Sequence, residues 1–201
     1  MSLKYTCWKC GLCCHEIVVN NEGYKKRIPL FPEEADRLIK LAKERAISFK
    51  IIEDLVFPDI LNKKIIVITW KILLDNPEKS CPFYIPKEGC SIHEIKPLAC
   101  KAFPLALERI DSFNIELSID PLCKFILSNY DTLKIVDMEK MKEIFEKEYP
   151  HAKELYKKNK KLILKIKRLE YENKIKIARE ITIAELNKAL NEWERIEIRV
   201  K

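Results

Sequence analysis

The chain has 201 residues, of which 47% are hydrophobic and 34% charged, a composition that supports a buried core and excludes wholesale disorder. Its apolar runs, such as Ile65–Ile68, are far shorter than the roughly 18–20 residues of a membrane-spanning helix, so we expect no membrane contact. No apolar stretch follows the first residues, which predicts a cytoplasmic protein, and 30 lysines among 38 basic residues favour a thermophilic source.

The distribution of Cys, Gly and Pro residues and the distribution of charge divide the chain into two parts. All eight Cys, all three Gly and all ten Pro lie at or before residue 150, and residues 1–150 carry 23 basic and 23 acidic residues. Residues 151–201 carry 15 basic and 8 acidic residues, so the whole net charge of +7 belongs to this stretch. We therefore predict a cysteine-cluster domain in residues 1–130 and a basic helical segment in residues 131–201.

Predicted helices and strands alternate in the first part. Pro32 opens an amphipathic helix whose apolar residues recur every three or four positions up to Ala46. The β-branched residues 65–70 predict a buried strand. Residues 105–110 and 113–119 predict an antiparallel hairpin with a turn at Asp111-Ser112, its second strand being half-buried from Phe113 onward.

The remaining predicted elements are helices. Asp137 caps one helix, and Pro150 ends that helix or starts the next, which carries apolar residues along one face. A last helix begins at the N-cap Thr182 and continues to Ile196. The pattern predicts an α+β fold, in which a small domain with a short antiparallel sheet is followed by a helical C-terminal segment.

The cysteines indicate a metal site. Four of them form a Cys-x2-Cys-x2-Cys-Cys run, and two-residue spacings allow thiolates to face one metal centre. Gly11 and Gly89 adjoin cysteines, where a turn around a metal needs positive φ or a close backbone approach. The predicted metal ligands are drawn from all eight cysteines: Cys7, Cys10, Cys13, Cys14, Cys81, Cys90, Cys100 and Cys123.

Disulfides are the alternative for these cysteines, because eight thiols permit four bridges and proteins of hyperthermophiles contain intracellular ones. A bridge between the adjacent Cys13 and Cys14 would be strained, so metal binding is the favoured interpretation. Eight thiols suit two centres of four ligands each, or one centre and a reserve of two thiols. The spacing leaves both arrangements open.

The type of donor atom limits which metals the site can bind. Thiolates suit Zn²⁺ or an iron–sulfur cluster, whereas hard cations prefer carboxylates. The spacing of Cys7, Cys10 and Cys13 matches the first three ligands of a bacterial ferredoxin-type run, while zinc sites more often pair two separate Cys-x2-Cys units. We favour an iron–sulfur cluster of the 4Fe–4S type, with Zn as the alternative. His15 and His93 are expected to support ligands through hydrogen bonds.

The ordered motifs Cys-x2-Cys-x2-Cys-Cys, Cys-Pro-Phe and Cys-x-Ile-His-Glu-x-Lys-Pro-x2-Cys-x2-Phe-Pro resemble those of the CxxCxxCC family of zinc- or iron-chelating domains over about residues 7–125. Lys96 and Lys101 stand where Arg is common in that family. The resemblance implies a metal-binding protein whose centre is structural or redox-active. The similar cluster of flagellin lysine N-methylases implies an alternative, an S-adenosylmethionine-dependent lysine methylase-like enzyme, although no Gly-x-Gly-x-Gly run follows a predicted strand.

A second alternative is a nucleic-acid-associated metal protein. Seven of the twelve residues from 157 to 168 are basic, and such a run contacts phosphates without reading sequence. The competing interpretation is a solvated face of an amphipathic helix, and the scarcity of Arg and of interleaved aromatic residues argues against base reading. The sequence also leaves room for a protein partner that it does not identify.

Overall fold

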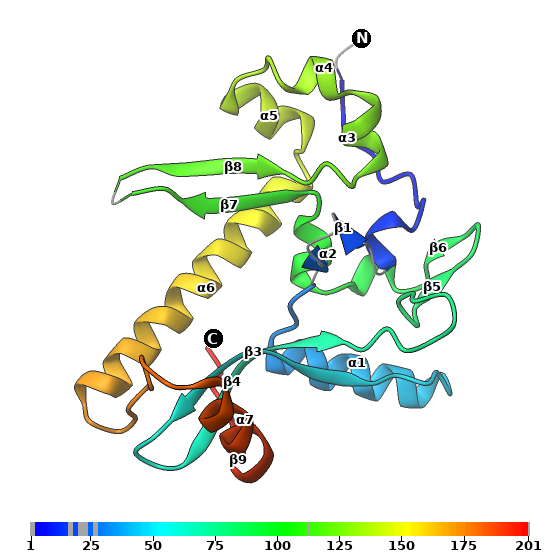
Figure 1. Ribbon diagram of the computed structural model, residues 1–201. Helices are drawn as coiled ribbons and strands as arrows, with labels where there is room; N and C mark the ends of the chain where they lie inside the picture. The colour runs from blue at the N-terminus through cyan, green and yellow to red at the C-terminus, as the bar shows by residue number, and fades with distance from the viewer. Residues whose placement is uncertain (1–2, 16–17, 20–23, 26–27, 112, 201) are drawn as a thin grey trace. The chain divides into compact units, whose positions relative to one another are not determined.

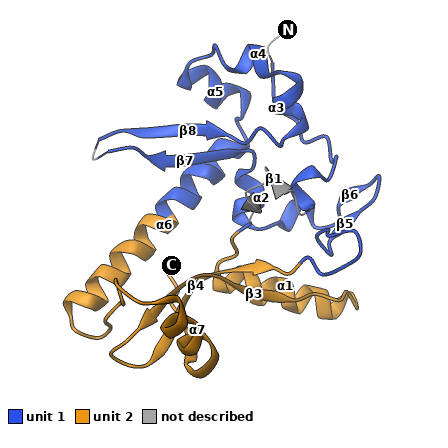
Figure 2. Ribbon diagram, viewed as in Figure 1, with its two compact units in different colours: residues 1–28, 74–157 blue, residues 29–73, 158–201 orange. Residues whose placement is uncertain are grey.

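The computed structural model describes residues 3–15, 18–19, 24–25, 28–111 and 113–200. The fold is α+β, as predicted, with helices, short sheets and a helical C-terminal segment (Figure 1). Internal contacts divide the chain into two compact units: unit 1 comprises residues 1–28 and 74–157, and unit 2 comprises residues 29–73 and 158–201 (Figure 2). Each unit contains residues from both predicted parts, and the domain boundary at residue 130 stays a prediction.

Unit 2 is built on a three-stranded sheet. Its elements are α1 (Pro32–Glu44), β3 (Ile51–Asp59), β4 (Lys64–Ile72), α7 (Ile183–Glu192), β9 (Glu194–Glu197) and the second half of α6 (Glu148–Tyr171). The strand order is β3-β4-β9, in which β3 and β4 are antiparallel and β9 runs parallel to β4. The predicted strand over residues 65–70 is confirmed as part of β4, at the centre of this sheet.

Helices cover β4 and bury its β-branched side chains. Ile65–Ile68 are at most 4% exposed, because successive side chains of a strand point to opposite faces and both faces are covered. On one face, Ala189 of α7 packs with Ile65 and Val67. Helix α1 also contacts β4, and Leu38 of this helix is fully buried.

Of the two helices predicted in unit 2, the first is confirmed and the second is shorter than predicted. The helix that Pro32 opens is confirmed, although it ends at Glu44, two residues before Ala46. The predicted continuation of the last helix to Ile196 is wrong, because α7 ends at Glu192 and the next residues form β9. The N-cap Thr182 is confirmed, since its hydroxyl accepts a hydrogen bond from the Glu185 N–H at 3.2 Å. The predicted short antiparallel sheet is confirmed, and the parallel β4–β9 pair is an addition that the sequence did not predict.

Unit 1 contains many short elements. They are η1 (Leu12–Cys14), β1 (Val18–Val19), β2 (Tyr24–Lys25), β5 (Tyr84–Ile85), β6 (Gly89–Cys90), η2 (His93–Ile95), α2 (Leu98–Ala102), β7 (Leu105–Arg109), β8 (Ile115–Ile119), α3 (Lys124–Ser128), α4 (Tyr130–Leu133), α5 (Met138–Ile144) and the start of α6. A hydrophobic core joins α2, α3, α5 and the first turns of α6, with Phe145 fully buried within it. The N-terminal segment adds to this core through Tyr5, whose N–H donates to the Ile144 carbonyl at 2.8 Å.

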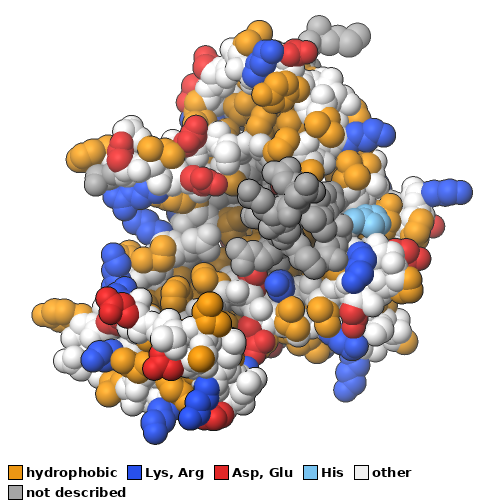
Figure 3. Space-filling view, in the orientation of Figure 1, with side chains coloured by type: hydrophobic (Ala, Val, Ile, Leu, Met, Phe, Trp, Pro, Cys, Tyr) orange, Lys and Arg blue, Asp and Glu red, His pale blue; other side chains and the backbone are white. Residues whose placement is uncertain are grey.

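The predicted hairpin is confirmed in β7 and β8, which pair antiparallel from Leu105 opposite Ile119 to Arg109 opposite Ile115. Its second strand begins at Ile115, however, and the expectation that Phe113 is half-buried is wrong. Phe113 lies in the connection and is 94% exposed. Hydrophobic side chains are visible on the surface at the end of this hairpin (Figure 3). Ser112 of the predicted turn lies outside the described residues.

The helices after the hairpin follow their predicted caps. The Asp137 carboxylate accepts a hydrogen bond from the Lys140 N–H at 2.8 Å at the start of α5. That helix ends at Ile144, and Pro150 stands in the first turn of α6, where its missing N–H costs no helical hydrogen bond. No helix among the described residues combines the length and the apolar character that a membrane span requires.

Candidate metal centre

The Cys-x2-Cys-x2-Cys-Cys run forms a tight loop with hydrogen bonds between its own residues. Lys9 and Gly11 both have positive φ, at 53° and 77°, and η1 follows with Cys13 and Cys14. The Gly11 carbonyl accepts two hydrogen bonds, from the Cys14 N–H at 2.7 Å and from Nδ1 of His15 at 2.8 Å. The loop therefore holds its thiols in place by backbone geometry, and His15 braces the loop as the sequence predicted.

Backbone pairing brings the second cysteine segment onto this loop. The Cys81 N–H donates to the Cys14 carbonyl at 2.7 Å, and His15 and Ser80 form an antiparallel bridge. Asn76 fixes the approach to this bridge, since its side chain accepts from the Ser80 N–H and donates to the Ser80 carbonyl, each at 2.8 Å. Cys81 thus lies directly beside Cys14, although a long stretch of chain separates them.

Two glycines allow the hairpin of β5 and β6 to pack against the loop. A Cβ atom added to Gly11 would lie 2.4 Å from the ring of Tyr84 on β5. A Cβ atom added to Gly89, which has φ of +92°, would lie 2.6 Å from Cβ of Lys9. Both distances are shorter than real Cβ contacts, so only glycine permits this packing. The prediction that these glycines serve a turn or a close approach is confirmed.

A small cavity of about 50 Å³ lies among these segments. Its lining includes most of the cysteines, the imidazole of His93, and the rings of Tyr5 and Trp8. The cysteines that line it are Cys7, Cys10, Cys13, Cys14, Cys90 and Cys123. The cavity therefore joins the N-terminal loop to β6 and to the start of α3.

Burial and mutual proximity raise the pKa values of several thiols. Burial raises the pKa of Cys81 to about 11 and raises the pKa of Cys100 well above its ordinary value. For both thiols the neighbouring Cys13 adds to the increase, and Cys90 does so as well. The pKa of Cys14 rises chiefly through a hydrogen bond with Cys13, whose Sγ lies 3.9 Å away. These mutual effects show that the five thiols are electrostatic neighbours.

Cys123 also lines the cavity, and it interacts with Tyr5. Burial raises the pKa of this thiol overall, whereas hydrogen bonds from the backbone of Ile126 and Phe125 and from the Tyr5 hydroxyl favour its thiolate. The Tyr5 ring is fixed by Phe125 and Phe145, with centroids 5.0 Å away in each case. Sequence reasoning missed Tyr5, because nothing local distinguishes it from any other aromatic residue near a cysteine.

Lys96 is a positive charge that acts on two of the thiols. It lowers the pKa values of Cys90 and Cys100, partly opposing the effect of burial, and its Nζ lies 3.5 Å from Nε2 of His93. A cation in this position favours the thiolates that a metal requires. The sequence marked Lys96 only as a departure from the family pattern, and the structure gives it this electrostatic role.

Among the described residues, no group of three or more His, Cys, Asp or Glu side chains is arranged to hold one metal ion. All eight cysteines are free thiols, and they are neighbours rather than a preformed ligand sphere. The donor set is nevertheless soft, since the described residues that line the cavity include cysteines and His93 but no carboxylate. Glu94, beside His93, has a side chain that is 96% exposed. The chemistry that the arrangement offers is therefore thiolate coordination.

Comparison with known proteins gives one match. The model of the family CxxCxxCC, described as "Putative zinc- or iron-chelating domain", matches residues 6–124. None of the curated proteins and none of the solved structures that were compared matches the chain. The matched range includes all eight cysteines and ends at the first residue of α3.

Proposed function

The chain belongs to the CxxCxxCC family, and we propose that it holds an iron–sulfur cluster of the 4Fe–4S type through its clustered cysteines, with zinc as the alternative. The observation that carries this proposal is the meeting of thiols from separate segments, with Cys81 hydrogen-bonded to the backbone of Cys14 and Gly89 packed on Lys9. Thiolate donors are the ligands that iron–sulfur clusters and zinc share.

The proposed ligands come from the N-terminal loop and from later segments of unit 1. Cys7, Cys10 and Cys13 supply three thiolates from one loop, in the spacing of a ferredoxin-type run. Further thiolates come from Cys81, which the backbone contact with Cys14 brings to the loop, and from Cys90, which the packing of Gly89 on Lys9 brings to it. The remaining candidates are Cys100, whose pKa is raised by burial and by Cys13, Cys81 and Cys90, together with Cys14 and Cys123, which line the cavity.

A bound centre would link segments that are otherwise held by a few backbone contacts. A 4Fe–4S cluster supplies one-electron redox chemistry when bound, and either metal supplies a covalent cross-link between distant parts of the chain. Around such a centre, this chain's own groups have clear tasks. Lys96 offsets the negative charge of the thiolates, the Tyr5 hydroxyl hydrogen-bonds Cys123, and His15 holds the loop. We propose a structural or redox role for the centre.

Anaerobic purification followed by iron, sulfide and zinc analysis tests the proposal. Brown protein with about four iron and about four sulfide per chain is the expected result. Colourless protein with bound zinc would show that the site holds zinc and not a cluster. Protein that contains neither iron nor zinc would contradict metal binding.

Serine variants test the ligand assignment. Cys10→Ser and Cys100→Ser are expected to abolish metal retention, because serine is a poor ligand for these metals and the two thiols stand in different segments. Cys123→Ser should have a milder effect, since this thiol lies twenty-three residues past Cys100 and apart from the others in the sequence. Ser91→Ala, beside Cys90, is the matched control and should keep its metal. Full metal content in Cys100→Ser would restrict the site to the N-terminal loop.

A further inference from the structure

Unit 2 contains a second feature that metal binding does not explain, an open hollow lined mostly by cations. Its lining comprises Glu33, Lys158, Lys161, Lys165, Arg199 and Val200, and its volume is about 860 Å³. Helix α6 contributes the three lysines, and the segment after β9 contributes the arginine. The lining therefore carries four basic side chains and one acidic side chain.

Helical spacing selects which cations of α6 face the hollow. Lys158, Lys161 and Lys165 are at positions i, i+3 and i+7, which places them along one face over about 10 Å of helix axis. Lys160 and Lys167 project from the opposite face, and both are exposed. The basic run that the sequence shows as one cluster is thus divided among different sides of the helix.

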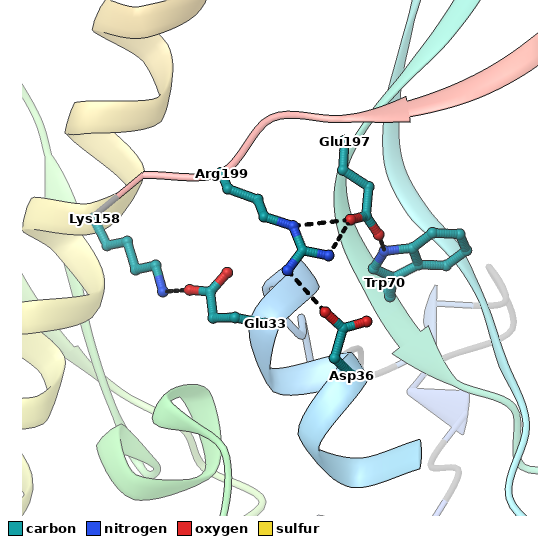
Figure 4. Close-up of polar contacts among 6 residues, drawn as sticks. All are labelled: Glu33, Asp36, Trp70, Lys158, Glu197 and Arg199. Atoms are coloured by element: carbon teal, nitrogen blue, oxygen red, sulfur yellow. Dashed lines mark hydrogen bonds and ion pairs between the residues drawn. The ribbon is translucent and has the colours of Figure 1, made fainter. Parts of the chain in front are cut away.

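Carboxylates hold Lys158 and Arg199 in place (Figure 4). Lys158 forms an ion pair with Glu33, and its Nζ lies 3.9 Å from the centroid of the Phe31 ring. The Arg199 guanidinium contacts Asp36 at 2.8 Å and Glu197, whose other oxygen accepts from Nε1 of Trp70 at 2.8 Å. These contacts anchor the C-terminal segment to α1 and β4.

The remaining chemistry of the hollow favours phosphate over carboxylate ligands. The planar fork of Arg199, which suits bidentate carboxylates, is already engaged by Asp36 and Glu197. Lys161 and Lys165 present compact ammonium groups, and Lys165 is positioned by a hydrogen bond of 2.7 Å to the Arg199 carbonyl. An ammonium has three donors, so Lys165 can contact an anion while it keeps this bond.

The row of lysines and the open shape of the hollow suit a ligand with several phosphates in line. We propose that this hollow binds the phosphate backbone of a nucleic-acid strand without reading its sequence. In the described part of the chain no aromatic side chain lines the hollow, so base stacking is not expected, and affinity should come from counterion release. The proposal concerns residues of unit 2 only and does not depend on the metal centre.

Fluorescence anisotropy with a labelled single-stranded 20-mer of mixed sequence, at low salt and with the full chain as purified, tests this proposal. The unaltered protein should bind with a Kd of about 1–100 μM. Lys161→Gln/Lys165→Gln should weaken binding about tenfold and reduce the slope of log K against log salt by about 1.4, because two phosphate contacts are lost. Lys160→Gln/Lys167→Gln removes the same charge from the opposite face and should change the Kd less than twofold.

A single variant and two folding controls separate loss of binding from loss of structure. Lys161→Gln alone retains the Lys165–Arg199 contact and should weaken binding about threefold. Circular dichroism and metal content should be equal in all variants. Equal weakening by the two double variants would mean that only net charge matters, and unchanged binding in Lys161→Gln/Lys165→Gln would show that the hollow is not used. Either result overturns the proposal.

Discussion

The sheet of unit 2 and the cysteine region of unit 1, defined as residues 7–14 and 81–100, are organised in opposite ways. The sheet has two nine-residue strands, β3 and β4, and buries four consecutive apolar side chains at its centre. The cysteine region has two strands of two residues each, two single turns of 3-10 helix, and the start of α2. Long ladders and apolar burial stabilise the first, whereas the second has thiols where a core would supply hydrophobic side chains.

Polar contacts differ between the two regions as well. In unit 2 the fully buried carboxylate of Asp59 accepts hydrogen bonds from the Leu61 and Lys176 N–H groups and from Nδ2 of Asn62, at 2.6–3.1 Å. The cysteine region instead contains half-buried thiols, and the charged forms of Cys81 and Cys100 are opposed by loss of solvent and by neighbouring thiols. The buried carboxylate of unit 2 already has its hydrogen-bond donors within the protein. The thiolates of unit 1 would instead be stabilised by a bound metal.

Removal of the metal should give the largest effect and should separate the two regions. We expect chelation to lower the thermal midpoint by about 10 °C or more, because the metal cross-links segments with few other contacts. Hydrogen exchange should speed up for amides of residues 7–14 and 81–100, while the β4 amides stay protected. If metal-loaded and metal-free protein melt together, the centre is not structural.

The next largest effect is expected in unit 2. Asp59→Ala leaves three part-buried donors without their acceptor and should reduce the free energy of unfolding by about 1–3 kcal/mol, measured by urea denaturation. Metal content should be unchanged, because Asp59 lies outside unit 1. Glu44→Ala, which removes a distant surface pair with Lys40, is the control and should be nearly neutral. A neutral Asp59→Ala would contradict the role assigned to this carboxylate.

Gly89→Ala examines the packing that assembles the cysteine region. Alanine at φ of +92° is strained, and its Cβ would meet Cβ of Lys9, which cannot move without its loop. We expect a cost of about 1–3 kcal/mol and reduced metal retention in a competition assay with a chelator. Lys87→Ala in the same hairpin is the control, since it removes no glycine, and it should retain metal normally. Equal retention by both variants would rule out the close approach as a requirement.

The smallest predicted effect is a pH dependence in unit 2. The pKa of Glu53 is lowered in the folded protein. The larger cause is a hydrogen bond from the Glu53 backbone, and the smaller is the ion pair with Arg195 at 2.9 Å. A carboxyl with a lowered pKa contributes stability above its unfolded pKa of about 4.3, and this contribution disappears as the pH falls through the folded pKa. Glu53→Gln should therefore cost less than about 1 kcal/mol at pH 7, and this cost should shrink as the pH falls below about 4 and through the folded pKa. A cost that is constant over this pH range would exclude the ionic contribution.

Local signals of the sequence determined several features of the fold. Pro32 starts α1, Asp137 caps α5, and the β-branched run at residues 65–70 lies in a buried strand. These features depend on one or two turns of backbone, so neighbouring residues suffice to specify them. The cysteine motifs likewise indicated the family, because their spacing is a local property that the fold does not alter.

Tertiary contacts decided the features that local signals missed. The residues after Trp193 continue the helical periodicity of α7, yet they form β9 because Ile196 pairs with Ile66 of a distant strand. The interleaving of two units, each made of two separate stretches, also has no local marker. Cys14 beside Cys81 and Tyr5 beside Cys123 are set in the same way, by backbone pairing and core packing between residues far apart in the chain. The sequence by itself determined which donors this protein has, and the tertiary structure decided which donors meet, because that depends on long-range contacts that no short stretch of residues encodes.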